Sequence, residues 1–540
     1  MRGMMMDRPL RIIDLLIYAA DMYPTEGITS VTVEGGLHRE TYPEMLARVG
    51  RLSQALRRLG IDAGDRVATL AWNGYRHMEL YYAIPGIGGV CHTLNPRLSA
   101  EQMGYIVNHA EDKVMCLDLT FVPLVEAMAP RFPADMTYVI MTDRAHMPET
   151  SLPNVLCYEE LIAAEDGQID WPDLDENSAA GLCYTSGTTG NPKGALYSQR
   201  SQVLHAMMAG CTSLGSLRAG QRILPVVPLF HANSWGLAHA APLTGASLIM
   251  PGPKLDGPSL WDLMDSEQVF SAWGVPTVWL GLMAEITARG AKPPTLEEMV
   301  VGGAAAAPSL IQGFEEMGVD VCHAWGMTEM SPIGTLGILG AQHKGLTDAE
   351  RLVLKSKQGR RAYLVDLKIV DEAGNRLPHD GVAAGELFVR GPFIVSGYFN
   401  NDAASAAALD ADGWFGTGDV ATIDADGFLM ITDRAKDLIK SGGEWISSID
   451  VENLALAHPD VANCAVIAVP HAKWDERPVL IAVAAVETPD SKSIQAHLAA
   501  HLAKWQLPDD IVFVDDLPLT ATGKVSKLTL RDRFKDHTLS

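Results

Sequence analysis

The chain has 540 residues, of which 47% are hydrophobic and 20% charged, with 42 Lys and Arg against 66 Asp and Glu. This length predicts two or more domains, and the hydrophobic fraction excludes a disordered chain. The net charge of −24 argues against a general nucleic-acid binder or a protein that binds anionic membranes, because both need a positive surface.

The seven cysteines are scattered and form no Cys-x-x-Cys pair. This pattern predicts neither a disulfide framework nor a structural zinc site, and it fits a reducing cytoplasm. The N-terminal segment has no apolar run long enough for a signal peptide, and no later stretch has the roughly 20 apolar residues of a membrane helix. We therefore expect a soluble cytoplasmic protein without a membrane span.

Helical and strand patterns alternate along most of the chain. Leucine and valine recur at helical spacing between residues 46 and 59, and Gly60 is placed to end this helix. Short apolar runs predict strands at residues 67–72, 114–117, 138–141, 180–183, 248–250 and 299–301. This rhythm is typical of largely parallel sheets with helices outside, in which ligands sit beyond the carboxyl ends of the strands.

The last third of the chain changes character. From residue 363 the sequence is rich in β alternation and turn signals, which predicts a smaller antiparallel barrel up to residue 434. A charged run at 433–437 then precedes about 100 residues, enough for one small domain. We predict an α/β fold with a large domain over residues 1–434, including the barrel at 363–434, and a small mobile α+β domain over 435–540.

One loop combines glycines and hydroxyl residues directly after the predicted strand at 180–183. Such a loop lets the backbone approach a polyphosphate and offers N–H and O–H donors, while Lys193 places a charge on the outer phosphates. It is not a Walker A loop, because no Gly-Lys-Ser/Thr closes it, and alone it could equally be a surface loop. Its residues are Thr185, Ser186, Gly187, Thr188, Thr189, Gly190 and Lys193.

This segment resembles the phosphate loop of the adenylate-forming superfamily, which comprises acyl-CoA synthetases, peptide-synthetase adenylation domains and luciferases. Further signatures of the superfamily occur in the expected order from about residue 25 to 530, so chance agreement is excluded. Within it, the chain is most similar to bacterial medium- and long-chain fatty acyl-CoA synthetases, a group that includes ligases for 3-methylthiopropionate. The segments 227–236, 433–447 and 503–508 carry this closer resemblance.

Two glycine-containing segments follow predicted strands and suit a nucleotide. Glycines after a strand let a flat ring lie against the backbone, although a tight turn is the plainer interpretation. Trp325 could stack on adenine, Thr328 could donate to the α-phosphate, and Glu329 could hold Mg²⁺ together with Thr188. The resemblance implies ATP or AMP contacts from the whole set, which is Gly302, Gly303, Ala304, Trp325, Gly326, Met327 and Thr328.

A carboxylate and an arginine near residue 430 complete the predicted nucleotide site. Asp419 can accept hydrogen bonds from both ribose hydroxyls, and the resemblance makes Arg434 its companion. Most of the superfamily has Gly before this arginine, whereas this chain has Asp433, a feature of the fatty acyl-CoA synthetase group. Read without context, Asp419 would be an ordinary turn residue.

His231 and Trp235 stand in the segment that resembles an acyl gate. The resemblance places His231 near the carboxylate and α-phosphate, where a donor would stabilise developing charge. Trp235 is either a core residue or a bulky gate across the acyl tunnel. The predicted acyl-binding residues are His231, Trp235, Gly302, Ala304, Met327 and Ile333.

Lys524 stands on a Thr/Gly turn near the C-terminus and, by resemblance, is the lysine that bridges the substrate carboxylate and the α-phosphate. The predicted catalytic residues are thus Lys524, His231, Thr188 and Glu329. The resemblance also implies rotation of the small domain about Lys436 between two half-reactions. Rotation would present a coenzyme A tunnel formed by Lys440, Ser441, Gly442, Gly443, Glu444 and Trp445.

The sequence therefore predicts an AMP-forming acid–thiol ligase that uses ATP, Mg²⁺ and coenzyme A. Its pocket residues are mostly apolar, which predicts a hydrophobic monocarboxylic acid, with a medium-chain fatty acid as first choice. Alternatives are a short thioether acid such as 3-methylthiopropionate, a branched or aryl acid, or an adenylating enzyme that loads a carrier protein in trans. A non-catalytic relative is disfavoured because Thr188, Glu329, Asp419 and Lys524 are all present. Relatives are often homodimers, so a homodimer is possible.

Overall fold

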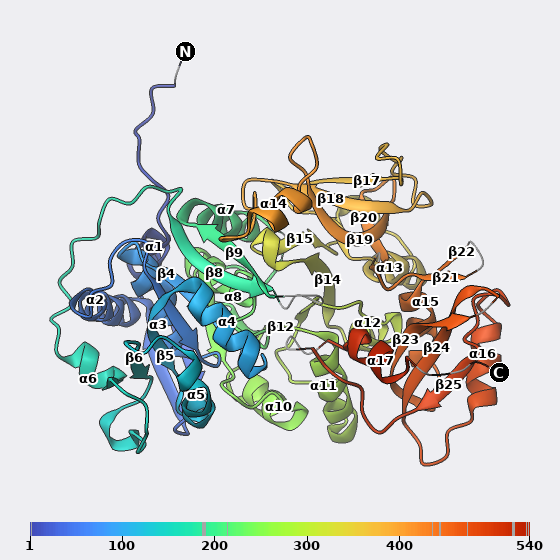
Figure 1. Cartoon of the computed structure of the whole chain (residues 1–540), viewed down its shortest axis with the longest axis horizontal. Helices are drawn as coiled ribbons and strands as arrows, with labels where there is room; N and C mark the ends of the chain where they lie inside the picture. The colour runs from blue at the N-terminus through green and yellow to red at the C-terminus, as the bar shows by residue number, and fades with distance from the viewer. Residues whose placement is uncertain are drawn as a thin grey trace.

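The computed structural model describes residues 1, 3–185, 191–212, 214–434, 436–441, 444–471, 473–520, 524–535, 537 and 539. Three sheets organise these residues, with helices packed around them, and the N-terminal segment extends away from the body (Figure 1). None of the helices within these ranges is long and apolar enough to cross a membrane.

The first sheet has seven strands, all parallel except β9, which pairs antiparallel with β8. In spatial order they are β7 (Val155–Cys157), β6 (Thr137–Ile140), β5 (Asp112–Leu117), β3 (Arg66–Leu70), β4 (Val90–Thr93), β8 (Ala179–Thr185) and β9 (Lys193–Ser198). Strands predicted from apolar runs are confirmed at β3, β5, β6 and β8. Their central residues are mostly apolar because both faces of the sheet are covered.

The second sheet has thirteen strands and changes from parallel to antiparallel along its length. In spatial order they are β17 (Asp366–Val370), β18 (Gly385–Arg390), β19 (Phe415–Ile423), β20 (Phe428–Arg434), β16 (Gly359–Arg361), β15 (Ile333–Leu336), β14 (Asp320–Gly326), β13 (Glu298–Val301), β12 (Ser271–Gly274), β10 (Arg222–Pro225), β11 (Ser247–Met250), β1 (Gly27–Val31) and β2 (Leu37–Thr41). The predicted strands at 248–250 and 299–301 are confirmed as β11 and β13.

The antiparallel character predicted for residues 363–434 is present, but its strands do not form a separate hydrogen-bonded unit. Strands β17 to β20 are antiparallel neighbours, and β20 pairs with β16, which pairs with β15 and so continues into β14 and the parallel part. The segment is therefore an antiparallel arm of the large sheet. Turn signals in the sequence reveal the hairpins, but not the partner of the last strand.

The third sheet is built only from strands that follow residue 434. In spatial order they are β22 (Glu444–Ile446), β21 (Ile439–Ser441), β24 (Asp475–Ala484) and β23 (Val461–His471), with β25 (Asp510–Phe513) parallel to β24. Two separate hydrophobic clusters pack on it. We refer to these residues as the small domain and to the preceding residues as the large domain.

The helices surround the sheets in both domains (Figure 1). In the large domain they are α1 (Ile12–Met22), α2 (Tyr42–Arg58), α3 (Tyr75–Gly86), α4 (Ala100–Ala110), α5 (Val122–Met128), α6 (Tyr158–Ala163), α7 (Gln199–Gly210), α8 (Ala232–Trp235), α9 (Leu237–Thr244), α10 (Gly257–Ser266), α11 (Pro276–Arg289), α12 (Pro308–Glu316), α13 (Asp348–Lys355) and α14 (Asp402–Ala408). In the small domain they are α15 (Ser448–Leu456), α16 (Ser491–Ala499) and α17 (Lys527–Arg533).

Helix α2 shows how local sequence sets these boundaries. Thr41 accepts a hydrogen bond from the backbone of Glu44, whose side chain bonds back to the Thr41 backbone, and Pro43 stands in the first turn. The apolar face with Val49 and Leu56 is buried in the main core. The predicted helix is thus confirmed, and it begins four residues before residue 46 because the capping box starts it.

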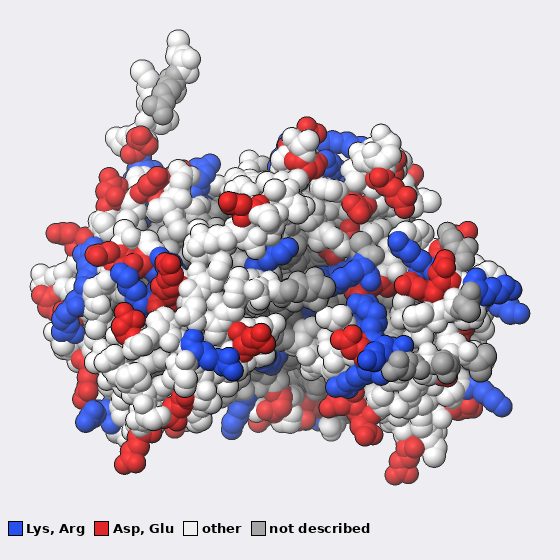
Figure 2. Space-filling model, in the orientation of Figure 1, with Lys and Arg blue, Asp and Glu red and all other residues white. Residues whose placement is uncertain are grey.

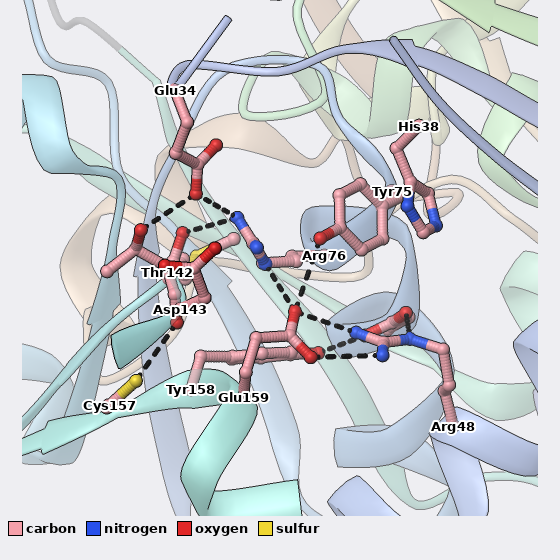
Figure 3. Close-up of polar contacts among 12 residues, drawn as sticks. Glu34, His38, Arg48, Tyr75, Arg76, Thr142, Asp143, Cys157, Tyr158 and Glu159 are labelled. Atoms are coloured by element: carbon pink, nitrogen blue, oxygen red, sulfur yellow. Dashed lines mark hydrogen bonds and ion pairs between the residues drawn. The ribbon is translucent and has the colours of Figure 1, made fainter. Parts of the chain in front are cut away.

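A network of buried charges ties α2, α3 and α6 together (Figure 3). Arg48 contacts Glu79 at 2.5 Å and Glu159 at 3.0 Å. Arg76 contacts Glu159 at 2.8 Å and Glu34 at 2.7 Å. Each guanidinium bridges two carboxylates from different elements, as its fork of donors allows. We call these five residues the N-terminal charge network.

Candidate active site

A cavity of about 860 Å³ lies between the two domains. Its walls include residues that follow β12, β13 and β14 at their carboxyl ends, and its cover includes residues of the small domain from α15 and from the segment that leads into α17. A site beyond the carboxyl ends of parallel strands is where such sheets usually bind ligands. Lys and Arg side chains lie on both sides of the hollow in the middle of this face, despite the net charge of −24 (Figure 2).

Asp419 and Trp325 meet on one wall of the cavity. Strand register places Asp419 opposite Arg434, and the Arg434 Nε lies 3.5 Å from Asp419 Oδ1. The Trp325 indole N–H donates to Asp419 Oδ2 at 3.1 Å. Burial raises the pKa of Asp419, and the Arg434 charge counteracts this. The carboxylate is thus held in place by the Arg434 charge and by the Trp325 indole N–H.

Lys524 reaches into the same cavity from the small domain. The Lys524 carbonyl accepts a hydrogen bond from Thr520 N at 2.6 Å, and Leu519 forms a bridge with Val525, so the backbone of Lys524 is held by pairing with residues 519 and 520. A Cβ built on Gly303 would lie 3.8 Å from Lys524 Cε. Burial and the Arg434 charge lower the pKa of Lys524 to about 8. The structure therefore brings the predicted lysine to the predicted glycine backbone.

Glu329 is buried on the wall beside the phosphate loop. Its Oε1 accepts a hydrogen bond from the Tyr398 hydroxyl at 2.8 Å, and burial raises the pKa of its carboxyl. Lys193 Nζ lies 5.0 Å from the centre of the Tyr398 ring. Tyr398 is a lining residue that the sequence did not single out, because a tyrosine in a loop gives no signal of its own. Residues Ser186, Gly187, Thr188, Thr189 and Gly190 lie outside the described residues.

A single buried carboxylate of this kind fits Mg²⁺, which binds through one or two carboxylates together with nucleotide phosphates. The Tyr398 hydroxyl orients this carboxylate through Oε1, and Glu329 would be the protein carboxylate that holds such an ion. Within the ranges that the structure describes, no group of three or more His, Cys, Asp or Glu could hold a metal ion. A magnesium ion held by Glu329 would take further ligands from the nucleotide phosphates.

Trp235, which the sequence predicted as an acyl-binding residue, lines the cavity. Its indole packs on the glycine backbone, where a Cβ built on Gly302 would lie 3.2 Å from Cη2. Residues 232–235 all have positive φ between 45° and 57°, which is a rare left-handed turn for residues other than glycine. The turn is fixed by the Asn233 amide, which donates to Gln202 at 2.8 Å, and by Ser234 Oγ, which donates to the Val227 carbonyl at 2.7 Å.

His231 begins this turn and lines the cavity, as do Ala304, Met327 and Ile333. Burial and the Lys524 charge lower the pKa of His231 to about 4, so the imidazole is neutral at neutral pH. A neutral imidazole can donate one N–H to a developing oxyanion without adding a second positive charge beside Lys524. The remaining predicted residues Thr185, Gly326 and Thr328 also line the cavity.

The predicted coenzyme A residues do not reach this cavity. Lys440, Ser441, Glu444 and Trp445 lie on β21 and β22, where Lys440 Nζ sits 4.6 Å from the Trp445 ring centre and Ser441 accepts a hydrogen bond from Arg477 at 2.9 Å. Gly442 and Gly443 lie outside the described residues. The predicted hinge residue Lys436 does line the cavity, and burial lowers its pKa. The structure thus assembles the nucleotide and acyl residues, but not the coenzyme A set.

Two domains that meet over one nucleotide-sized cavity, with a lysine supplied by the smaller domain, define an enzyme that activates a carboxylic acid with a nucleotide. The chain belongs to the AMP-binding enzyme family: residues 20–399 match that family, and residues 450–524 match the AMP-binding enzyme C-terminal domain. The superfamily predicted from the motifs is confirmed.

Similar proteins and solved structures indicate which kind of AMP-binding enzyme the chain resembles. The chain is 49% identical to a 3-methylmercaptopropionyl-CoA ligase of Ruegeria lacuscaerulensis, over 99% of each chain. It is 47% identical to a medium-chain-fatty-acid–CoA ligase of Ectopseudomonas oleovorans, over 99% of this chain and 98% of the relative. The crystal structure of ATP-bound MatB from Rhodopseudomonas palustris matches with a TM-score of 0.81 and 26% identity, over 97% of this chain and 99% of that one. The predicted fold class and the predicted enzyme class, an AMP-forming acyl-CoA ligase, are confirmed.

Proposed function

We propose that this enzyme converts an unbranched hydrophobic monocarboxylic acid, ATP and coenzyme A into the acyl-CoA thioester, AMP and pyrophosphate, with a medium-chain fatty acid as the preferred substrate. The observation that carries this proposal is the position of Lys524, which enters the cavity of the large domain beside Gly303 and across from Asp419. One buried cation from a second domain suits a reaction in which negative charge spreads over an α-phosphate.

In the first half-reaction the substrate carboxylate oxygen attacks the α-phosphorus of ATP, and the bond to pyrophosphate breaks. Lys524 would orient the carboxylate and neutralise the pentavalent transition state, with the neutral imidazole of His231 as an N–H donor. Asp419 would hold the ribose hydroxyls, and Trp325 would flank the adenine. Glu329 would hold Mg²⁺, which supplies further charge neutralisation at the phosphates when it is bound.

In the second half-reaction the coenzyme A thiol releases its proton to solvent as its sulfur attacks the acyl carbonyl, and AMP leaves with the electron pair of the bond between the acyl carbon and the phosphate oxygen. The residues around Lys440 and Trp445 would act here, and they lie away from the cavity in the present arrangement. We propose that the small domain rotates about Lys436 between the half-reactions, so that domain 435–540 moves as a unit against 1–434. Because the rotation brings a different side of the small domain to the nucleotide, the same nucleotide site can be used in both half-reactions.

The choice of acid rests on an apolar acyl end without a fixed cation for a second carboxylate. The proposed preference is supported by the resemblance to a ligase named for medium-chain fatty acids. A short thioether acid is the second candidate, supported by the 49% identical relative and by the bulky Trp235 indole, which packs on the Gly302 backbone. Each methylene in such a pocket changes binding by about 1–3 kcal/mol, which is enough to set a preference.

The test is coenzyme A-dependent AMP release over a panel from propionate to dodecanoate, with 3-methylthiopropionate, a branched acid, an aryl acid and a dicarboxylate. We expect the highest kcat/KM for a medium-chain acid. A maximum at 3-methylthiopropionate would favour the second candidate. Turnover with carrier protein but not with coenzyme A, or a preference for dicarboxylates, would contradict the proposal.

A further inference from the structure

Asp433 of the large domain and Ser448 of the small domain meet in a buried contact. Asp433 is the last but one residue of β20, and Ser448 is the first residue of α15. The Ser448 backbone N–H and hydroxyl both donate to Asp433 Oδ2, at 2.7 and 2.6 Å. The two residues are 1% and 0% exposed. The remaining oxygen of Asp433 accepts from the Arg434 N–H at 2.7 Å, so this carboxylate is fully engaged.

This contact continues toward the catalytic turn of the small domain. The Ser448 hydroxyl accepts a hydrogen bond from Lys527 Nζ at 2.5 Å, and the same ammonium pairs with Glu452 at 2.7 Å. Lys527 stands three residues after Lys524 and begins α17. Although burial acts in the opposite direction, the charges of Glu452 and Asp433 raise the pKa of Lys527. A continuous line of charge-assisted bonds therefore runs from the large domain to the base of the Lys524 turn.

The position of Asp433 at the start of a helix adds to this contact. The first turn of α15 directs unpaired N–H groups and a partial positive charge toward the carboxylate. The helix has its own cap, since Ser447 Oγ accepts from Asp450 N at 3.1 Å, so Asp433 serves an additional N–H. A buried carboxylate is costly unless its bonds are satisfied, and two of the three donors come from the small domain. Asp433 thus favours the docked arrangement specifically.

Another side-chain contact crosses the same junction and is weaker. Ser447 Oγ donates to the Thr432 carbonyl at 2.6 Å, a neutral bond. The pair between Arg531 and Asp437 at 2.7 Å lies within the small domain. Asp433 is therefore the strongest single link between β20 and α15.

We propose that Asp433 is a positioning residue that docks α15 on the large domain and so holds Lys524 in the cavity for the first half-reaction. This inference rests on the proposed function, and it explains why this chain has a carboxylate where the superfamily usually has glycine. The same contact has to open when the small domain presents Lys440 and Trp445, because rotation about Lys436 separates β20 from α15.

The test compares Asp433→Ala with Asp433→Asn, which keeps an acceptor, and with Asp490→Ala. Asp490 caps α16 within the small domain, where its side chain accepts from Lys492 N at 2.9 Å and its N–H donates to Asp460 at 3.0 Å. For Asp433→Ala we expect kcat of acid-dependent ATP–pyrophosphate exchange to fall about tenfold or more, because two bonds to a charged acceptor are lost. Thioester formation from supplied acyl-adenylate should be retained, Asp433→Asn should recover part of the loss, and Asp490→Ala should match the wild type.

Hydrogen exchange gives a readout that is independent of activity. In the wild type the first turn of α15 should be protected, and in Asp433→Ala it should exchange about tenfold faster or more while β23 stays protected. Unchanged protection of α15, or an equal loss of both half-reactions, would overturn the positioning role. Absence of exchange activity in the wild type with every acid would overturn the proposed function instead, and the hydrogen-exchange comparison would still decide the contact.

Discussion

The N-terminal charge network and the cavity around Lys524 both bury charged groups. They differ in whether the buried cation has an ion-pair partner. In the network, Arg48 lies 2.5 to 3.0 Å from two carboxylates, and although burial opposes it, Glu79 and Glu159 raise the pKa of Arg48. At the cavity, Lys524 has no ion-pair partner among the residues that the structure describes, and burial lowers its pKa. The ion pairs of Arg48 hold parts of the fold together, whereas the ammonium of Lys524 is available to bind a substrate.

The largest expected effect comes from breaking the network. Arg48→Met should lower the free energy of unfolding by about 3–5 kcal/mol, because it leaves the buried Glu79 without its partner. Urea denaturation measures this loss, and Arg351→Met is the matched control, since its pair with Glu315 at 3.6 Å is 43% exposed on the arginine side. That control should cost less than about 1 kcal/mol. Equal losses in the two variants would show that the network is not a stabilising unit.

Removing Lys524 should lower the rate of the first half-reaction and leave the stability of the fold nearly unchanged. Lys524→Ala should slow acid-dependent pyrophosphate formation about 100-fold or more, the effect of removing one preorganised charge from a transition state. Thioester formation from supplied acyl-adenylate should be nearly unchanged, and so should the urea midpoint. A comparable loss in both half-reactions would contradict the assigned role.

Lys436→Pro tests whether the two faces of the small domain alternate. Proline fixes φ and should hinder the rotation, so thioester formation should slow about tenfold, a barrier increase of about 1.4 kcal/mol, while adenylation is spared. Single-turnover measurements of the two half-reactions separate these effects. An unimpaired overall rate would argue against a hinge at this residue.

The smallest expected effect is the change in the adenylation rate with pH. Because the charged form of Lys524 acts, and burial with the Arg434 charge lowers its pKa to about 8, the rate of adenylation should decline as pH rises through about 8. Lys524→Arg should move this decline to higher pH, since a guanidinium keeps its proton. A wild-type profile that stays flat from pH 7 to about 10, near the ordinary lysine pKa, would contradict a lysine perturbed by burial.

The sequence predicted those parts that depend on local pattern. Apolar runs identified β3, β5 and β13, and the ordered motifs identified Asp419, Glu329 and Lys524 as lining one site, which the structure brings together around a single cavity. It could not predict Tyr398 as the partner of Glu329, or Ser448 as the partner of Asp433. Both pairs join residues distant in sequence or on opposite sides of a linker, so no periodicity or spacing records them.

The pairing of the antiparallel strands also could not be predicted from local sequence patterns. Turn signals indicated hairpins after residue 363, but the join between β20 and β16 is made by residues about 70 positions apart and depends on register. Similarly, the left-handed turn at residues 232–235 contains no glycine before Gly236. Its composition therefore does not predict positive φ angles there.

The most direct test of the account is a crystal structure with a non-hydrolysable acyl-adenylate analogue, such as the acyl sulfamate of adenosine. We predict that its ribose hydroxyls bond to Asp419, that its acyl chain points toward Trp235, and that Lys524 Nζ donates to the group that replaces the phosphate. An analogue bound elsewhere, or Lys524 remote from that group while the small domain is docked as it is here, would contradict the account.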